Sequence, residues 1–287
     1  MTYKQNRSHR PWKIVAGCCC IQGSVLGLLV NCRGLFFEPV CADLGFNIGG
    51  LFYGLACVIA IPTAAKVLER YDLRVTLTLS SVFMALVQAL FGSFTRQWHW
   101  YAAALQGMAS AFLFSLTTPL LINNWFTQKR GMMLAITGMS SGAVAAIMNP
   151  IGSMVIEQLG WRAGYRFFGL LFLLMTLPAT IFWLRLRPKT AEPPSGGSRL
   201  SGFQGNVWRT IRQPGFLLLI VITGVANLLT CCSQMLSSYG TAIGLTASAC
   251  AMLLSLSMVG NVLLKLLLGA IHDLANALTA VMVGIGL

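Results

Sequence analysis

One lysine lies inside a long apolar stretch, near the C-terminal end of that stretch. Lys265 lies within residues 246–268, where Ser257 and Asn261 precede it at four-residue intervals, so the three side chains share one face of a helix. An ammonium at the centre of a membrane helix costs about 2.5–3.5 kcal/mol on insertion scales and tends to be retained for a partner or a substrate. We expect this stripe to face a cavity and to bind an anion. The competing interpretation is snorkelling, in which the four-carbon stem carries the charge to the nearby interface.

A second apolar stretch also carries polar side chains on one face. Asn227 and Gln234 share a face within residues 215–239 and are further candidates for the cavity wall, although small polar residues that merely bond neighbouring helices are more common. The 7 Asp and Glu residues and the 3 His residues fall at the ends of apolar stretches or between them. This disfavours a carboxylate proton relay and a membrane enzyme. We expect no metal and no cofactor.

Membrane helices must position these side chains. The 287 residues are 56% hydrophobic and only 9% charged, whereas soluble domains carry about 25% charged residues. Apolar runs of about 20 residues are long enough to cross a bilayer as helices. The expected spans are 14–36, 48–67, 75–95, 99–122, 131–156, 163–184, 215–239 and 246–268, with a ninth beginning near Ala277. The predicted fold class is an all-α membrane protein with eight complete spans.

The net charge is +13, and the cations are distributed along the chain as expected for a membrane topology. Most of the 20 Lys and Arg residues lie between alternate spans, and Arg33, Arg96, Arg162 and Arg166 are the cations in or near the opposite loops. The positive-inside rule then predicts a multi-pass protein whose N-terminus is cytoplasmic. These cations form no clustered basic face, so we expect the lipid bilayer and not nucleic acid as the partner.

The chain divides at one long polar stretch. Residues 185–214 are rich in Pro, Gly and Ser and predict a flexible cytoplasmic linker between a six-span half, residues 1–184, and an incomplete second half, residues 215–287. The loop after the second span is repeated after the eighth, with Glu69 aligned on Asp273. The second half therefore begins as a copy of the first.

Three motifs and this loop carry a resemblance to a known family. The loop residues Glu69, Arg70 and Arg74 are similar to the loop motif of the major facilitator superfamily. The motifs are Gly34-Leu35-Phe36-Phe37-Glu38-Pro39-Val40, Asn124-Trp125-Phe126-Thr127-Gln128-Lys129-Arg130-Gly131 and Gly160-Trp161-Arg162. Together they resemble the branch of monocarboxylate transporters and oxalate/formate antiporters. The resemblance implies two six-helix halves, and hence a chain truncated inside its ninth helix.

The resemblance also implies roles for single residues. Lys265 stands four residues before Gly269, as a substrate-binding Arg does in monocarboxylate transporters. Asn31 falls where those proteins place a lysine of the first helix. Arg33 lies two residues on, which turns its side chain by about 200°, so it is a substrate contact or an outer packing residue.

The same resemblance makes the loop residues Glu69, Arg70 and Arg74, with Asp273 in the repeat, a cytoplasmic gate. Charges that only fix topology are the alternative. The implied function is a secondary carrier of the plasma membrane that moves a small organic anion, a mono- or dicarboxylate, by alternating access. A carrier of another substrate class and a non-transporting fragment are the alternatives.

Overall fold

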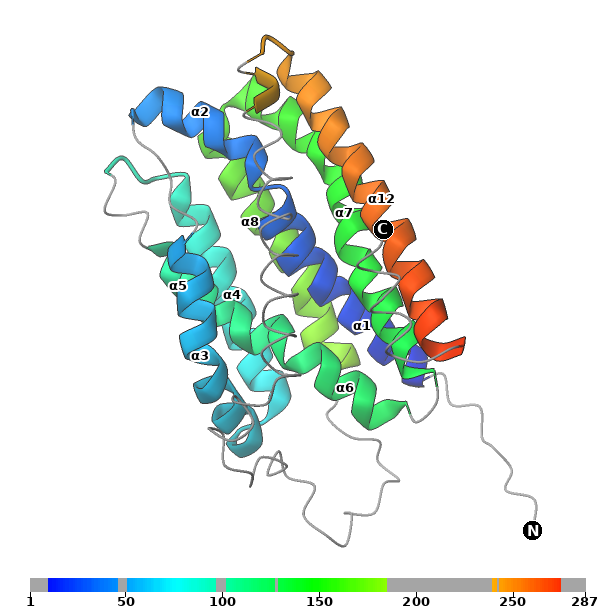
Figure 1. Cartoon of the computed structure of the whole chain (residues 1–287). Helices are drawn as coiled ribbons and strands as arrows, with labels where there is room; N and C mark the ends of the chain where they lie inside the picture. Colours follow the sequence, from blue (N-terminus) through cyan, green and yellow to red (C-terminus); the bar gives the residue numbers. More distant parts are fainter. Residues whose placement is uncertain are drawn as a thin grey trace, which may run out of the picture.

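The chain forms a bundle of long helices in the computed structural model shown in Figure 1, which describes residues 10–45, 51–96, 102–126, 129–184, 239–241 and 243–274. Within these ranges the structure contains helices and no strand. Helix α1 (Arg10–Gln22) begins at the lower end of the bundle in Figure 1 and continues through the π-helix η1 (Gly23–Asn31) into α2 (Gly34–Leu44) at the upper end.

The next five helical rods run alternately down and up beside the first. They are α3 (Leu51–Arg70), α4 (Leu73–Phe91), the rod α5 (Ala103–Ser110), η3 (Ala111–Ser115) and α6 (Thr117–Trp125), α7 (Arg130–Leu159), and the rod α8 (Trp161–Pro178) and η4 (Ala179–Trp183). A last helix, α12 (Ala247–Leu274), lies along α7 in the opposite direction (Figure 1).

Six helical stretches of the described residues are long and apolar enough to cross a membrane. They are Pro11–Leu44, Leu73–Phe91, Ala103–Trp125, Arg130–Leu159, Trp161–Trp183 and Ala247–Ile271. Helix α3 takes the place of the second expected span, whereas the expected spans 215–239 and from Ala277 onward, and the linker 185–214, lie outside the described residues. The expected count of eight crossings is therefore not confirmed.

The first helix is longer than predicted. The apolar run suggested an end at residue 36, but the helix continues to Leu44, and Gly45 ends it with a φ of 68°. Pro39 is accommodated inside α2. Gly45 donates its backbone N–H to the Cys41 carbonyl at 2.9 Å, which is a left-handed glycine cap.

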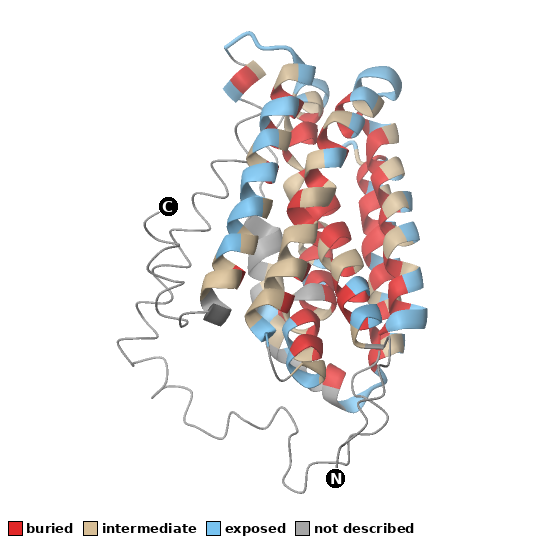
Figure 2. Ribbon diagram, turned by 90° about the vertical axis from the view of Figure 1, so that its right-hand side faces the viewer, coloured by how far each residue is buried: buried red, intermediate tan, exposed pale blue. Residues whose placement is uncertain are grey.

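Large apolar side chains cover the outside of the bundle. Figure 2 shows exposed positions along the outward sides of the helices and buried positions between them. Leu79, Ile147, Leu174 and Leu263 are among the exposed apolar residues on four different helices. Such a surface suits contact with lipid chains and is not the surface of a soluble domain.

An aromatic cluster fills the core between α2, α4 and α8. The Phe36 ring lies 4.1 Å from the Tyr165 ring and 5.4 Å, edge on, from the Phe168 ring, centroid to centroid. Gly152 and Gly164 make room for these rings, because a Cβ on Gly152 would lie 2.8 Å from Phe168 Cζ and one on Gly164 would lie 3.0 Å from Phe36 Cε1. Interlocked rings of this size fix α2 and α8 in one position.

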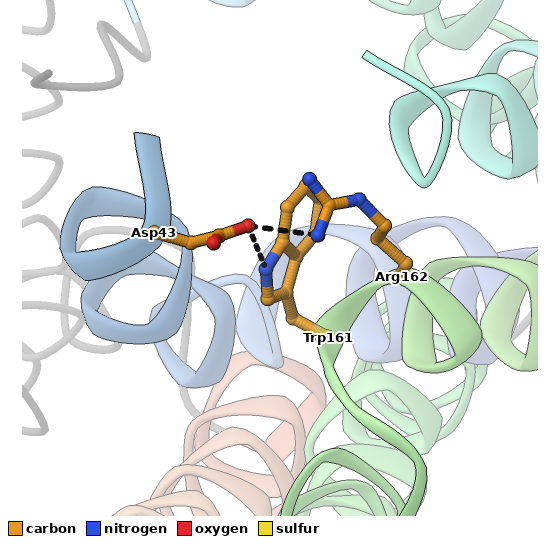
Figure 3. A network of polar contacts seen from close by, with 3 residues as sticks. All are labelled: Asp43, Trp161 and Arg162. Carbon is orange, nitrogen blue, oxygen red and sulfur yellow. Dashed lines mark hydrogen bonds and ion pairs between the residues drawn. The ribbon is translucent and has the colours of Figure 1, made fainter. Parts of the chain in front are cut away.

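Polar contacts tie the same rods together at the upper end of the bundle. Asp43 Oδ2 accepts hydrogen bonds from Arg162 Nη1 at 2.7 Å and from Trp161 Nε1 at 3.2 Å (Figure 3). The Arg162 guanidinium also lies 4.2 Å from the centre of the Trp161 ring. Gly92, at the end of α4, touches the backbone of Arg162, since a Cβ there would lie 2.5 Å from its carbonyl oxygen. The Gly-Trp-Arg motif thus joins the first, third and sixth rods, and we name this junction the upper clamp.

Candidate functional site

Lys265 reaches from α12 across to α7. Its ammonium donates to the Gly138 carbonyl at 3.1 Å and to Ser141 Oγ at 3.2 Å, and Ser141 Oγ donates to the same Gly138 carbonyl at 2.8 Å. Gly138 lies eight residues from the first residue of α7, about 12 Å along the helix axis. The ammonium is thus turned sideways onto a neighbouring helix at depth. Snorkelling would instead extend it toward a helix end.

The partners of this ammonium are neutral oxygens. Among the described residues, the ion pair of the structure joins Arg162 and Asp43 at the upper clamp, and no carboxylate contacts Lys265. A half-buried cation whose partners are dipoles is only partly compensated, because a charged acceptor makes a stronger hydrogen bond than a neutral one. The arrangement can therefore take an anion.

The rest of the predicted stripe on α12 also lies beside α7. A Cβ on Gly142 would lie 3.5 Å from Asn261 Oδ1, which places this amide next to the α7 backbone. Asn261 is exposed and Ser257 is half-buried, with the Ser257 hydroxyl donating to the Leu254 carbonyl of its own helix at 2.7 Å. The structure thus brings Lys265 and Asn261 to the same face of α7. Asn227 and Gln234 lie outside the described residues.

Small residues allow α12 to approach α7 closely. A Cβ on Gly142 would lie 2.8 Å from Val262 Cγ2 and 3.0 Å from the Met258 carbonyl, and one on Gly269 would collide with Ala135 Cβ. Gly138 and Gly142 form a G-x-x-x-G pair, the spacing that brings membrane helices together. This pair, with Ser141 between its glycines, is the signal that sequence reasoning missed as the partner of Lys265.

The first helix closes on the other side of the same segment of α7. A Cβ on Gly27 would lie 2.9 Å from the Ser141 carbonyl, and Ser140 Oγ donates to the Cys19 carbonyl at 3.0 Å. Adjacent serines therefore serve two different contacts. Ser140 bonds to α1, whereas Ser141 accepts from the ammonium of α12.

Arg33 belongs to a separate polar network. Its Nη2 donates to Gln106 Oε1 at 3.4 Å, and Gln106 Nε2 donates to Gln88 Oε1 at 2.6 Å, which links the first rod to α5 and α4. Both glutamines are buried. Asn31, the last residue of η1, is half-buried. The structure thus gives Arg33 and Lys265 different partners, and the bond from Arg33 to Gln106 joins the first rod to α5.

One amide on α7 is buried. Asn149 is 0% exposed, and neither its Nδ2 nor its Oδ1 has a hydrogen-bond partner among the residues that the structure describes. It lies seven residues after Gly142, or two helical turns, and so lies on the face that α7 turns to α12. A buried amide left in this state destabilises the arrangement that buries it.

The residues of the predicted gate lie at the lower end of the bundle. Asp72 caps α4 by accepting from the Arg74 backbone N–H at 3.0 Å, and Arg74 Nε donates to the Leu184 carbonyl at 2.9 Å. Leu184 lies against Gly17 of α1, where a Cβ would be 2.8 Å from Leu184 Cδ2. We name this junction of the first, third and sixth rods the lower clamp. Arg70 is exposed, and the side chains of Glu69 and Asp273 lie outside the described residues.

The described residues of the Asn-Trp-Phe to Lys-Arg-Gly motif lie at the end of α6 and the start of α7. Asn124 and Trp125 end α6, the extended Phe126 follows, and Arg130 Nε donates back to the Phe126 carbonyl at 2.7 Å. Lys129 adopts a φ of 54° immediately before α7, and Gly131 lies in the first turn of that helix. The motif thus lies at the start of the helix that carries Ser141.

A bundle of apolar rods with an internal cation defines a multi-pass membrane protein. The model of the Major Facilitator Superfamily matches residues 37–287, so the chain belongs to this superfamily. The superfamily expected from the sequence is confirmed. Its members and the relatives named below are transporters, not enzymes.

Three relatives illustrate what this chain is similar to. The chain is 22% identical to monocarboxylate transporter 4 of Rattus norvegicus over 226 residues, which are 75% of this chain and 47% of that protein. It is 32% identical to the putative glycerol-3-phosphate transporter 2 of Arabidopsis thaliana over 143 residues, 46% of this chain and 27% of that protein. It is 23% identical to an uncharacterized transporter of the superfamily from Bacillus subtilis over 150 residues, 51% of this chain and 36% of that protein.

The matches support the monocarboxylate transporter branch at low identity. The chain spans about half the length of the first curated relatives that it matches, since the aligned residues cover 47% of each.

Proposed function

We propose that this chain is a secondary carrier, or the main part of one, that moves a small organic anion across a membrane by alternating access. Mono- and dicarboxylates are the favoured substrates. The observation that carries the proposal is the Lys265 ammonium, which lies at depth between α7 and α12 with neutral oxygens as its contacts. The proposed site is Lys265 with Asn261 and Ser257 on α12, while Asn227 and Gln234 complete the wall.

The second candidate substrate is an organic phosphate. The match to a putative glycerol-3-phosphate transporter has the higher identity among the relatives described above, although it covers less of the chain. Phosphate and carboxylate oxygens both bind an ammonium through charge-assisted hydrogen bonds. The substrate screen must therefore include both classes.

The proposed membrane placement follows the cation distribution. We place the lower end of the bundle, with Arg10, Arg70, Arg74 and Arg130, in the cytoplasm of a cell whose plasma membrane holds the protein. Residues 185–214 then form a cytoplasmic linker. Labelling of single cysteines at positions 128 and 196 in a cysteine-free background tests this topology, and labelling of both from outside only would contradict it.

The substrate class is tested by thermal stabilisation of the purified protein. A ligand that binds the folded state raises its melting temperature by mass action. We expect pyruvate, oxalate or glycerol 3-phosphate to raise it, and sugars and organic cations to leave it unchanged. Stabilisation by sugars or cations alone would contradict the proposal.

The role of Lys265 is tested by removing its charge and keeping its length. Lys265→Met retains a long flexible stem without the ammonium, so it should abolish stabilisation by anions and leave membrane insertion intact. Lys265→Arg should retain part of the binding. Unchanged anion affinity in correctly inserted Lys265→Met would show that the ammonium does not meet the substrate.

A further inference from the structure

The bonds of Lys265 join two parts of the chain that are far apart in sequence. Ser141 belongs to the six-helix half and Lys265 to α12, and 124 residues separate them. The ammonium, the Ser141 hydroxyl and the Gly138 carbonyl form a closed triangle of hydrogen bonds. We name Ser141 Oγ and the Gly138 carbonyl the lysine dock.

The groups of the lysine dock remain hydrogen-bonded without the lysine, whereas the lysine ammonium loses its acceptors without the dock. The Ser141 hydroxyl already donates to the Gly138 carbonyl, and that carbonyl is the normal acceptor for the N–H four residues on in the helix. Removal of the ammonium would leave both groups satisfied. Removal of the dock would leave a half-buried cation without its two acceptors, which is the costlier loss.

An anion and the dock compete for the same donors. An ammonium has three N–H donors, and two of them are directed at the dock. A carboxylate accepts more strongly than a carbonyl or a hydroxyl, so it draws these donors toward itself. We propose that the dock is the resting place of the Lys265 ammonium and that an anionic substrate must withdraw the ammonium from it, which weakens the contact between α7 and α12.

This inference rests on the proposed function and adds a transport mode to it. The empty carrier is held with α12 bonded to α7, whereas the loaded carrier has lost these two directional bonds and keeps the small-residue contact at Gly142 and Gly269. A loaded carrier therefore changes its orientation faster than an empty one. Such a carrier exchanges one anion for another faster than it moves anions one way.

The chain offers a matched pair of variants for the test. Ser141→Ala removes one acceptor of the ammonium, and Ser140→Ala removes a hydroxyl that bonds to the Cys19 carbonyl within the six-helix half. We expect Ser141→Ala to bind pyruvate or oxalate about five- to tenfold more tightly than the parent, because less competes with the anion. We expect Ser140→Ala to keep the affinity of the parent. Unchanged or weaker binding by Ser141→Ala overturns the proposal.

Reconstituted vesicles test the transport mode. The ratio of exchange to one-way efflux of labelled pyruvate should fall in Ser141→Ala, because its empty form is less strongly held, and should stay at the parental value in Ser140→Ala. An unchanged ratio in Ser141→Ala overturns the predicted preference for exchange.

A distance measurement without any anion separates this inference from the proposed function. Spin labels at Ile147→Cys on α7 and Leu263→Cys on α12, both exposed positions, report the spacing of the two helices in a cysteine-free background. Ser141→Ala should broaden the distance distribution, and Ser140→Ala should not. An unchanged distribution overturns the dock alone. A parent protein that binds none of the tested anions overturns the proposed function and, with it, the displacement of the lysine.

Discussion

The contact between α8 and its neighbours differs in construction from the contact between α7 and α12. Helix α8 is held by interlocked rings and by a clamp at each end, where Asp43 and Arg74 bond to its rod. Helix α12 meets α7 through glycines and one lysine. Interlocked rings cannot slide without losing contact, whereas small residues offer a smoother surface. The contacts of α8 therefore suit a permanent unit, whereas the contact between α7 and α12 suits movement.

We expect the largest loss of stability from a substitution in the permanent contact, the ring cluster around α8. Phe168→Ala removes a ring that is 0% exposed and packs against Phe36. We expect a loss of about 3 to 5 kcal/mol in the free energy of unfolding, since the neighbouring rings cannot collapse into the space. Denaturant unfolding in detergent measures it. Leu170→Ala, at a position 60% exposed on the same helix, should change stability by less than about 0.5 kcal/mol, and equal losses in both variants would contradict the ring cluster.

The sequence predicts the local features of this bundle, such as helix length, better than it predicts contacts between residues far apart in the chain. Apolar run lengths place most of the described rods within a few residues, because the bilayer sets the length of a crossing helix. The end of the first helix was missed, since the signal at Gly45 lies beyond a polar segment containing Glu38 and Pro39. The sequence singles out Lys265 by its cost in the membrane. It does not show the acceptor, since pairing with Ser141 depends on how α7 and α12 are rotated against each other.

We expect an intermediate loss of stability from adding one methyl group to the upper clamp, and a smaller loss from adding one between α7 and α12. A Cβ on Gly92 would lie 2.5 Å from the Arg162 carbonyl, a backbone atom fixed by the upper clamp, so Gly92→Ala should cost about 1 to 3 kcal/mol. Gly142→Ala should cost less, because its nearest obstacle is the Val262 side chain and α12 can move away as a body. Thermal unfolding compares them. Gly260→Ala is the control, because no described atom outside its own helix backbone and chain neighbours lies within 4 Å of the added Cβ. A larger cost at Gly142 than at Gly92 would reverse the comparison.

The smallest expected effect is a gain in stability within the movable contact. Asn149→Leu replaces a buried amide that has no hydrogen-bond partner in the described part of the chain with an apolar side chain of similar size, so we expect stability to rise by about 1 kcal/mol. A higher melting temperature without ligand would confirm it. A fall in melting temperature would mean that the amide finds a partner in the folded population.

The lower clamp bonds the start of the third rod to the end of the sixth, although 110 residues separate them in the sequence. Arg74 lies in the first turn of α4, and Leu184 directly follows η4 at the end of the sixth rod. Because the Arg74 guanidinium bonds to the Leu184 backbone carbonyl, a force that acts on the chain at Leu184 is shared with the start of α4, which Asp72 caps, and does not fall on the end of η4 alone. The third rod therefore bears part of any load applied at the end of the sixth.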